Sequence, residues 1–447
     1  MLIVRSPVRI SFGGGGTDLP SYYERFGGAV LSAAVNKYFY TVLQKRSDGK
    51  IQIISADLRA METWQNIARM EVFGNALEIP LAVLREFGRE VSVNLFLASE
   101  IPPGTGLGSS ASVCVNLTKL LAAYNQISLS KYELAERAFH VARDVLGRPV
   151  GKQDEYASAF GGLNFISFQP DGATQVDPLP LEPDLLRELQ SSLLLFFTGE
   201  SHHSWTILKE QEESTRKTDS GAVEYLHEIR KLAEPMRAAL LAGELNQFGL
   251  LLHEGWEIKK RVSSRISNPR IDELYQAALQ NGAVGGKITG AGGGGFLLLF
   301  CQPPCQQNVR NALAGMGVRE MGFEFDFQGA QVVANDPFID GDENGGMRWT
   351  FAPVAGKTVT VKSRPPKSPS RTPMSLARGL RPLNESLLAG RRARDSTAAI
   401  DRRHAEMPSS SSRRTHVAHL VRDLPPVRYR RSLDQYSRAR RRRSRIH

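Results

Sequence analysis

The pattern best suited to chemistry in this 447-residue chain is a glycine-rich segment, PPGTGLGSSAS, at residues 102–112. It follows a predicted strand at 91–98 and precedes apolar residues at helical spacing. Its three glycines let backbone N–H groups converge, and a helix N-terminus carries roughly half a positive charge. The segment therefore predicts an anion cradle for a polyphosphate, with Ser109 or Ser110 capping the helix. A capped helix that binds no phosphate is the alternative.

The cradle differs from two familiar nucleotide-binding patterns. It lacks the lysine that ends the Walker A loop GxxxxGK[ST], which excludes a P-loop NTPase. It also lacks an acidic residue about 20 positions further on that would bind a ribose, because Ser128 to Lys131 stand there. A dinucleotide-binding domain is therefore not predicted.

Two further glycine-rich segments flank the cradle in the sequence. In RISFGGGGTDLP, an alternating stretch at 2–12 predicts a strand that runs into Gly13 to Gly16, followed by Thr17 and Asp18. The hydroxyl of Thr17 and the carboxylate of Asp18 thus lie beside backbone that a ligand can approach closely, as in a binding site. The alternative is a glycine-rich hairpin turn without a ligand. In KITGAGGGGF, the small residues 290–295 precede a buried strand. This loop can pack closely against another loop or a ligand, unless it is a bare turn.

The composition is that of a folded globular protein long enough for two hydrophobic cores. Hydrophobic residues make up 41% of the chain and aromatic residues 8%, and no apolar run approaches the roughly 20 residues that span a bilayer. The N-terminus lacks the apolar stretch of a secretory signal. We therefore expect a cytoplasmic protein without a membrane partner. Its cysteines, Cys114, Cys301 and Cys305, predict reduced thiols rather than disulfides or a zinc site.

Positive charge is concentrated at the C-terminal end of the chain. Residues 334–447 carry 25 Lys plus Arg against 10 Asp plus Glu, whereas residues 1–333 carry 32 against 36. The basic segment also lacks hydrophobic periodicity and contains Pro-rich and Ser-rich pieces, which predicts a disordered tail. An arginine-rich tail can bind nucleic acid through phosphate contacts. A passive extension or a translated frame change is favoured over such binding.

Together, RISFGGGGTDLP, PPGTGLGSSAS and KITGAGGGGF resemble the three ordered motifs of the GHMP small-molecule kinases, over residues 1 to about 333. GGGGTDLP and GRPVGKQDEYASAFGGLNFI look most like the D-glycero-D-manno-heptose 7-phosphate kinases of that family. The resemblance implies a two-domain α+β fold. Residues 1–175 would resemble ribosomal protein S5 domain 2, and 176–333 would form a ferredoxin-like domain. The active site would lie between the domains, and 334–447 would be the tail.

The resemblance also implies that the second and third segments bind ATP and Mg²⁺. The ATP-binding residues would be Gly104, Gly106, Leu107, Gly108, Ser109, Ser110, Gly290, Gly292 and Gly293. Family members use the second serine as a magnesium contact, which is Ser110 here. They often carry a second magnesium ligand, a glutamate, about a dozen residues before the catalytic aspartate. Ala142 stands at that place, and Asp144 could replace the glutamate only if the helix is shifted or a water bridges the gap.

Four residues would act on the acceptor. By resemblance, Asp154 in GKQD is the base that accepts the proton of the attacking sugar hydroxyl, and Arg9 keeps Asp154 ionised. Asp18, with Thr17 beside it, would bind sugar hydroxyls, and Lys152 would neutralise a substrate or nucleotide phosphate. Each has a structural alternative: a helix N-cap for Asp154, a surface ion pair for Arg9, a turn cap for Asp18 and a solvated side chain for Lys152.

The leading functional prediction is an ATP-dependent, magnesium-assisted kinase that phosphorylates the anomeric hydroxyl of a heptose 7-phosphate for nucleotide-activated heptose synthesis. Another sugar kinase, such as a fucokinase, and a non-kinase enzyme of the same fold, such as diphosphomevalonate decarboxylase, are alternatives. A nucleic-acid binder carried by the tail is a third class. His202 and His203 predict loop residues near substrate rather than a metal site, because adjacent histidines point to different faces. The sequence leaves a homo-oligomer open.

Overall fold

The computed structural model of the chain describes residues 1–350 except 89, 200–203, 217–220, 337 and 342–346. These residues form helices and strands in mixed order around separate sheets, which confirms the predicted α+β class. The predictions for His202, His203 and the tail beyond residue 350 lie outside the described residues. None of the helices in the described part is long and apolar enough to cross a membrane.

The larger sheet is organised around one long strand, β2. Its strands are β1 (Leu2–Gly13), β2 (Gly28–Lys45), β3 (Ile51–Ser55), β4 (Ala60–Trp64), β5 (Val93–Ser99), β6 (Leu163–Phe168), β7 (Thr174–Pro178) and β12 (Gln331–Asn335). They lie in the order β12-β1-β2-β5-β3-β4, and β6 pairs with both β2 and β7. The first half of β2 pairs with β6 and its second half with β5, while β1 runs along both halves. The strands predicted at 2–12 and 91–98 correspond to β1 and β5.

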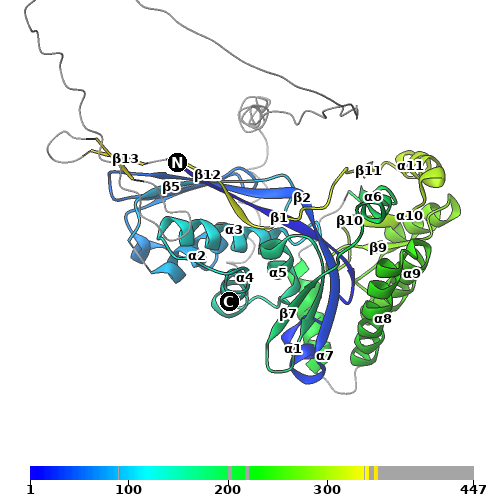
Figure 1. Cartoon of the computed structure of the whole chain (residues 1–447). Coiled ribbons are helices and arrows are strands. Elements are labelled where there is room, and N and C mark those ends of the chain that lie inside the picture. The colour runs from blue at the N-terminus through cyan, green and yellow to red at the C-terminus, as the bar shows by residue number, and fades with distance from the viewer. Residues whose placement is uncertain (89, 200–203, 217–220, 337, 342–346, 351–447) are drawn as a thin grey trace, which may run out of the picture. The chain divides into compact units, whose positions relative to one another are not determined.

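Helices cover one face of this sheet, as Figure 1 shows. They are α2 (Glu78–Phe87), α3 (Ser109–Tyr124), α4 (Lys131–His140) and α5 (Gln153–Phe160), and a π-helical turn (Val141–Val145) continues α4. Helices α3 and α5 both pack on β1 and β2. The apolar side of α3 buries Leu117 and Leu121 in one cluster with Leu2, Val4 and Leu95 of the sheet. The short helix α1 (Pro20–Phe26) connects β1 to β2, and a 3-10 turn (Ile67–Arg69) precedes α2.

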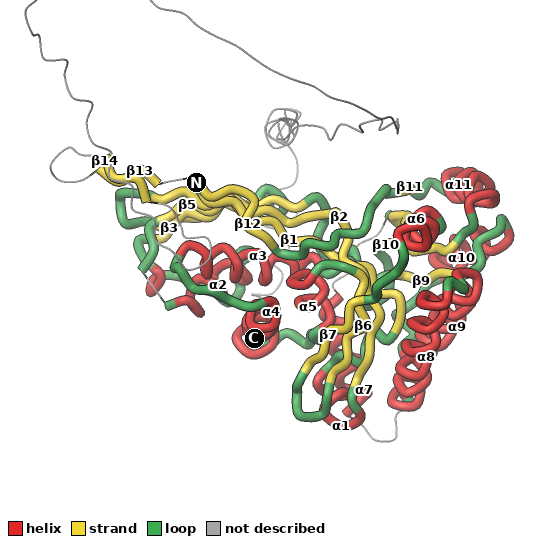
Figure 2. The backbone as a smooth tube through the Cα atoms, viewed as in Figure 1, coloured by secondary structure: helices red, strands yellow, loops and turns green. Residues whose placement is uncertain are grey.

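A smaller antiparallel sheet has the order β11-β8-β10-β9. Its strands are β8 (Leu193–Phe197), β9 (Gly285–Ile288), β10 (Phe296–Phe300) and β11 (Arg319–Glu320). The helices of this part are α6 (Pro183–Ser191), α7 (Ser204–Arg216), α8 (Ala222–Ala242), α9 (Leu245–Val262), α10 (Pro269–Gln280) and α11 (Gln306–Gly315), with a 3-10 turn at Pro303–Cys305. Figure 2 shows α8, α9 and α10 beside the strands of this sheet.

One hydrophobic cluster joins the two sheets and thereby fixes β1. Ile10 and Phe12 of β1 pack with Leu195, Phe248 and Phe300 from the smaller sheet and its helices. Because successive side chains of a strand point to opposite faces, Arg9 is directed away from this cluster. The apolar residues of β1 therefore fix the strand, and Arg9 extends from its opposite face toward α5.

Strand pairing continues into the segment predicted to be a tail. Ala334 and Asn335 of β12 pair with Ile3 and Leu2, and β13 (Phe338–Gly341) pairs antiparallel with β14 (Met347–Thr350). The three cysteines are free, as predicted.

Candidate active site

The loop before α3 has a backbone conformation that favours glycine. Gly104, Gly106 and Gly108 have φ angles of 75°, 83° and 76°, in the left-handed region. Gly108 is itself the N-cap of α3, and no side chain caps the helix. The prediction that Ser109 or Ser110 is the cap is therefore wrong: both lie inside the first turn, and Ser110 is exposed. The first N–H groups of α3 remain available to an anion.

The third glycine-rich segment packs directly on this loop. A Cβ atom added to Gly290 would lie 2.5 Å from the Cα of Gly106, and one added to Gly106 would lie 2.4 Å from the carbonyl oxygen of Thr289. A Cβ on Gly295 would lie 2.3 Å from the carbonyl oxygen of Thr105. The predicted close packing of two glycine loops is thus present, and it leaves no room for side chains at the contact.

Arg9 and Asp154 form a two-pronged ion pair beside the same loop. Arg9 Nε and Nη2 each donate to a carboxylate oxygen of Asp154 at 2.7 Å, and Nη1 donates to the carbonyl oxygen of Gly106 at 2.6 Å. The Arg9 side chain is only 5% exposed, whereas that of Asp154 is 26% exposed. Asp154 lies in the first turn of α5, after its N-cap Lys152. A helix cap for Asp154 and a surface ion pair for Arg9 are therefore excluded.

Asp18 lies next to this pair and is buried. Its carboxylate accepts hydrogen bonds from the Gly16 N–H at 2.9 Å and from Gln153 Nε2 at 3.1 Å. Burial raises the pKa of Asp18, and the negative charge of Asp154 raises this pKa further. Two carboxylates thus meet at the first turn of α5, one held by an arginine and one held by amide donors.

Thr17 and Lys152, also predicted to contact the acceptor, are directed elsewhere. Thr17 is fully buried, and its hydroxyl donates to the carbonyl oxygens of Gly14 (2.8 Å) and Ala29 (3.1 Å), so it closes the turn after β1. Lys152 Nζ donates to Glu136 at 2.7 Å and to the carbonyl oxygen of Gly172 at 2.8 Å, and the side chain is buried. Both polar groups are bonded within the protein, and Lys152 is not the solvated side chain of the alternative.

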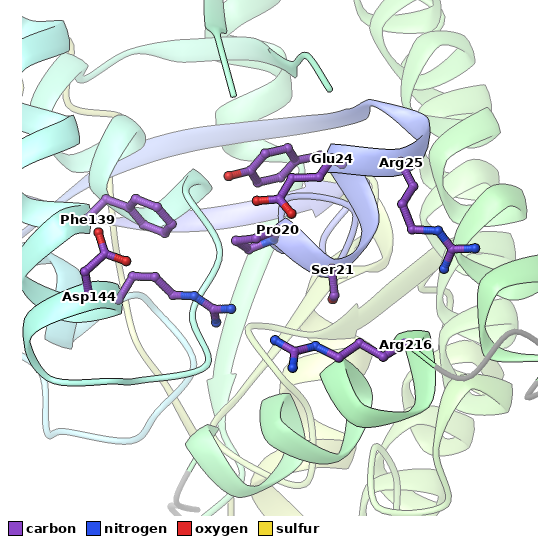
Figure 3. A pocket seen from close by; sticks show the side chains of 9 residues that line it. Pro20, Ser21, Glu24, Arg25, Phe139, Asp144 and Arg216 are labelled. Atoms are coloured by element: carbon purple, nitrogen blue, oxygen red, sulfur yellow. The ribbon is translucent and has the colours of Figure 1, made fainter. Parts of the chain in front are cut away.

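Asp144 is also separated from the glycine loops. Its carboxylate bonds to His140 Nδ1 at 2.7 Å, and it lines a cavity of about 550 Å³ between α1, α7 and the π-helical turn. Figure 3 shows Asp144 and Arg216 on opposite sides of this cavity, with Pro20 and Ser21 between them. Asp144 lies on the π-helical turn Val141–Val145 that continues α4. Ala142 is buried in the core.

Three buried ionisable residues of this region were missed by sequence reasoning. Glu155 is 1% exposed, Lys259 of α9 is 8% exposed and Lys287 of β9 is 6% exposed. Lys259 donates to the carbonyl oxygen of Gly290, and Lys287 donates to that of Phe12 at 3.1 Å. The sequence offered one signal, since Lys287 opens KITGAGGGGF; nothing distinguishes Lys259 from the basic residues beside it.

Glu155 predicts a measurable pH effect on stability. Burial raises its pKa well above the ordinary 4.5, and the charges of Asp154 and Asp18 add to the shift. Between about pH 4.5 and the folded-state pKa, the folded state therefore binds more protons than the unfolded state, and stability falls as the pH rises through this window. Glu155→Gln removes this loss, so the variant should gain stability over the wild type with rising pH. Urea unfolding of both proteins from pH 4 to 9 measures the difference, and parallel curves would contradict it.

Two models of one protein family match this chain. Residues 73–162 match the family model for the GHMP kinases N terminal domain, and residues 236–318 match that for the GHMP kinases C terminal domain. The chain belongs to the GHMP kinases, ATP-dependent enzymes that phosphorylate hydroxyl groups of small molecules.

Among its relatives are kinases that act on sugars. The chain is 31% identical over 330 residues to the D-glycero-alpha-D-manno-heptose 7-phosphate kinase of Campylobacter jejuni, covering 72% of this chain and 95% of the relative. It is 28% identical to the L-fucokinase/L-fucose-1-P guanylyltransferase of Bacteroides fragilis, covering 67% of this chain and 34% of the relative. A D-glycero-D-manno-heptose 1-phosphate kinase of Bacteroides thetaiotaomicron superimposes with a TM-score of 0.63 at 29% identity, covering 75% and 99% of the two chains.

Proposed function

We propose that this GHMP sugar kinase transfers the γ-phosphoryl group of ATP to the anomeric hydroxyl of D-glycero-D-manno-heptose 7-phosphate, in a route to nucleotide-activated heptose. The observation that carries the proposal is the adjacency of Asp154, held by Arg9, and the buried Asp18 at the contact of the two glycine loops. The heptose 7-phosphate kinase of Campylobacter jejuni supports the choice of acceptor, because almost its entire length aligns with this chain.

In this proposal, Asp154 is the general base. It accepts the proton of the anomeric hydroxyl as that oxygen bonds to the γ-phosphorus, and the bond from the γ-phosphorus to the bridging oxygen breaks to release ADP. Arg9 fixes both oxygens of Asp154 and carries a permanent positive charge beside the transferred group. Asp18 accepts hydrogen bonds from further sugar hydroxyls, which orients the acceptor.

The first N–H groups of α3 and the loop from Gly104 to Gly108 would hold the ATP phosphates. Mg²⁺, when bound, neutralises charge on the phosphate oxygens. The exposed Ser110 hydroxyl in the first turn of α3 fits as its protein ligand, whereas Asp144 does not, because it is bonded to His140. The described residues contain no group of three His, Cys, Asp or Glu side chains that would bind a metal by themselves. Phosphate oxygens and water would supply the remaining ligands.

An acceptor panel tests the substrate assignment. The full-length chain with ATP and Mg²⁺ should turn over D-glycero-D-manno-heptose 7-phosphate with kcat/KM at least about 10²-fold above the values for L-fucose, galactose and mevalonate, because a site built for a phosphorylated heptose rejects acceptors without its partners. Coupled ADP release measures the rates, and phosphorus NMR of the product locates the new phosphate. A phosphate on any carbon other than C1 would contradict the proposed position.

L-fucose is the second candidate acceptor, because the Bacteroides fragilis relative with fucokinase in its name aligns with this chain over 331 residues. Turnover of fucose at the highest kcat/KM of the panel would replace the heptose assignment. It would leave Asp154, Arg9 and Asp18 in the same roles, since both acceptors offer an anomeric hydroxyl.

A further inference from the structure

Lys259 and Lys287 are buried lysine side chains beside the glycine loops. Both side chains are less than 9% exposed, and neither forms an ion pair with any residue in the described part of the chain. Lys259 donates to the carbonyl oxygen of Gly290, and Lys287 to that of Phe12. An ammonium group has three donors, so each retains donors beyond its one carbonyl partner. Buried charges are normally paired, because their desolvation is costly.

Lys259 lies at the contact of the two glycine loops. Its partner Gly290 packs against Gly106, whose carbonyl oxygen accepts a hydrogen bond from Arg9. Burial and, to a smaller extent, the positive charge of Arg9 lower the pKa of Lys259 to about 8, while the charge of Asp18 opposes the shift. The pKa of Lys287 is lowered well below its usual value by burial and by the charges of Lys259 and Arg9. Lys259, Lys287 and Arg9 therefore lie close enough for their charges to interact, with Asp18 near Lys259 and Asp154 bonded to Arg9.

Arg9 already places Nε and Nη2 on Asp154 and Nη1 on Gly106. Lys259 is thus the cation with uncommitted donors next to the loop contact. If it served only to fix Gly290, a neutral donor would suffice without the cost of a buried charge. A phosphate group is the anion that this position suits, because Lys259 bonds to Gly290 where this residue packs on Gly106 of the proposed ATP-phosphate loop.

We propose that Lys259 binds the terminal phosphoryl group during transfer. The proposal rests on the kinase function proposed above. In a loose transition state, charge spreads over the oxygens of the transferred group, and a fixed ammonium offsets it. Lys259 touches the reacting group and is therefore a catalytic residue. The other phosphate that could reach it is the one carried by the acceptor.

The test compares nucleotides with and without a third phosphate, using the full-length chain and Mg²⁺. Calorimetry measures the Kd of ADP and of the non-hydrolysable triphosphate AMPPNP for the wild type, Lys259→Met, Lys259→Arg and Lys260→Met. The first variant should bind AMPPNP about 10–100-fold more weakly and ADP within about threefold of the wild type. The arginine variant should recover most of the loss. Lys260, paired with Glu257 at 2.8 Å, is the adjacent control and should change neither Kd.

Thermal unfolding of the proteins without nucleotide is the control that each variant is folded. Removing an unpaired buried charge should raise the Tm of Lys259→Met, whereas a structural lysine would lower it. Equal weakening of ADP and AMPPNP, or no weakening, would overturn the proposal. The proposal would also be overturned if Lys259→Met left the Kd of AMPPNP unchanged and raised only the KM for a phosphorylated sugar. That result would assign Lys259 to the phosphate of the acceptor. The nucleotide assay needs no acceptor, so the failure of every sugar would refute the substrate proposal and leave this one standing. A wild type that binds neither nucleotide would refute both.

Discussion

Asp154→Asn is expected to lower kcat by about 10²–10⁴-fold, the range that a positioned general base contributes. The substitution keeps the side-chain shape and removes the acceptor of the hydroxyl proton. It also leaves the buried Arg9 guanidinium without a carboxylate, since Asp154 provides both of its short ion-pair contacts. Steady-state ADP release with saturating acceptor measures the loss. ADP binding should stay within about threefold of the wild type, because the proposed role of Asp154 is to accept a proton from the acceptor and not to hold the nucleotide.

Asp144→Asn is the matched control for this experiment. It is the same chemical change in a carboxylate that bonds to His140 and lines a different cavity. We expect its kcat to remain within about twofold of the wild type, as for a surface ion pair. A large loss in Asp144→Asn would restore it as a magnesium ligand. A kcat for Asp154→Asn within tenfold of the wild type would contradict the assignment of Asp154 as the base.

The glycine segments were the most informative part of the sequence, because the backbone conformation that requires glycine is a local property. Gly104, Gly106 and Gly108 need positive φ, and only glycine adopts it readily, so the pattern predicts the loop without knowledge of the fold. The strand β1 was predictable because its signal, the pattern of residues 2–12, is also local in the sequence. The sequence predicted that the segment around Gly290 packs closely against another loop or a ligand. It did not identify Gly106 as the partner, because the two glycines lie far apart in the sequence.

Side-chain direction could not be predicted from the sequence. Thr17 and Asp18 are neighbours, yet the hydroxyl closes a turn and the carboxylate faces Gln153, a distinction set by the strand β2 behind Thr17. Lys152 is two residues from Asp154 but points to Glu136 on α4. Lys259 reaches the site from α9, which the fold brings to Gly290. Such partners depend on tertiary packing, which local patterns do not encode.

Gly106→Ala is expected to lower the free energy of unfolding by about 2–5 kcal/mol. The alanine would have to adopt a φ of 83°, at a cost of roughly 1–2 kcal/mol, and its Cβ would lie 2.4 Å from the carbonyl oxygen of Thr289. Relieving this clash separates the two glycine loops, for roughly 1–3 kcal/mol more. Because the same loops would cradle ATP, the Kd for AMPPNP should rise at least about tenfold. Urea unfolding and calorimetry measure the two effects.

Gly49→Ala separates backbone strain from the loop contact. Gly49 has a φ of 75°, close to that of Gly106, but no atom outside its chain neighbours lies within 4 Å of an added Cβ. This variant should therefore lose only the roughly 1–2 kcal/mol of the left-handed conformation and bind AMPPNP as the wild type does. The stability difference between the two variants measures the cost of parting the loops. Equal losses of stability with unchanged nucleotide binding would mean that the loops do not touch in the active protein. A larger loss of stability in Gly106→Ala, together with weaker AMPPNP binding, would show that nucleotide binding requires the contact between Gly106 and the segment around Gly290.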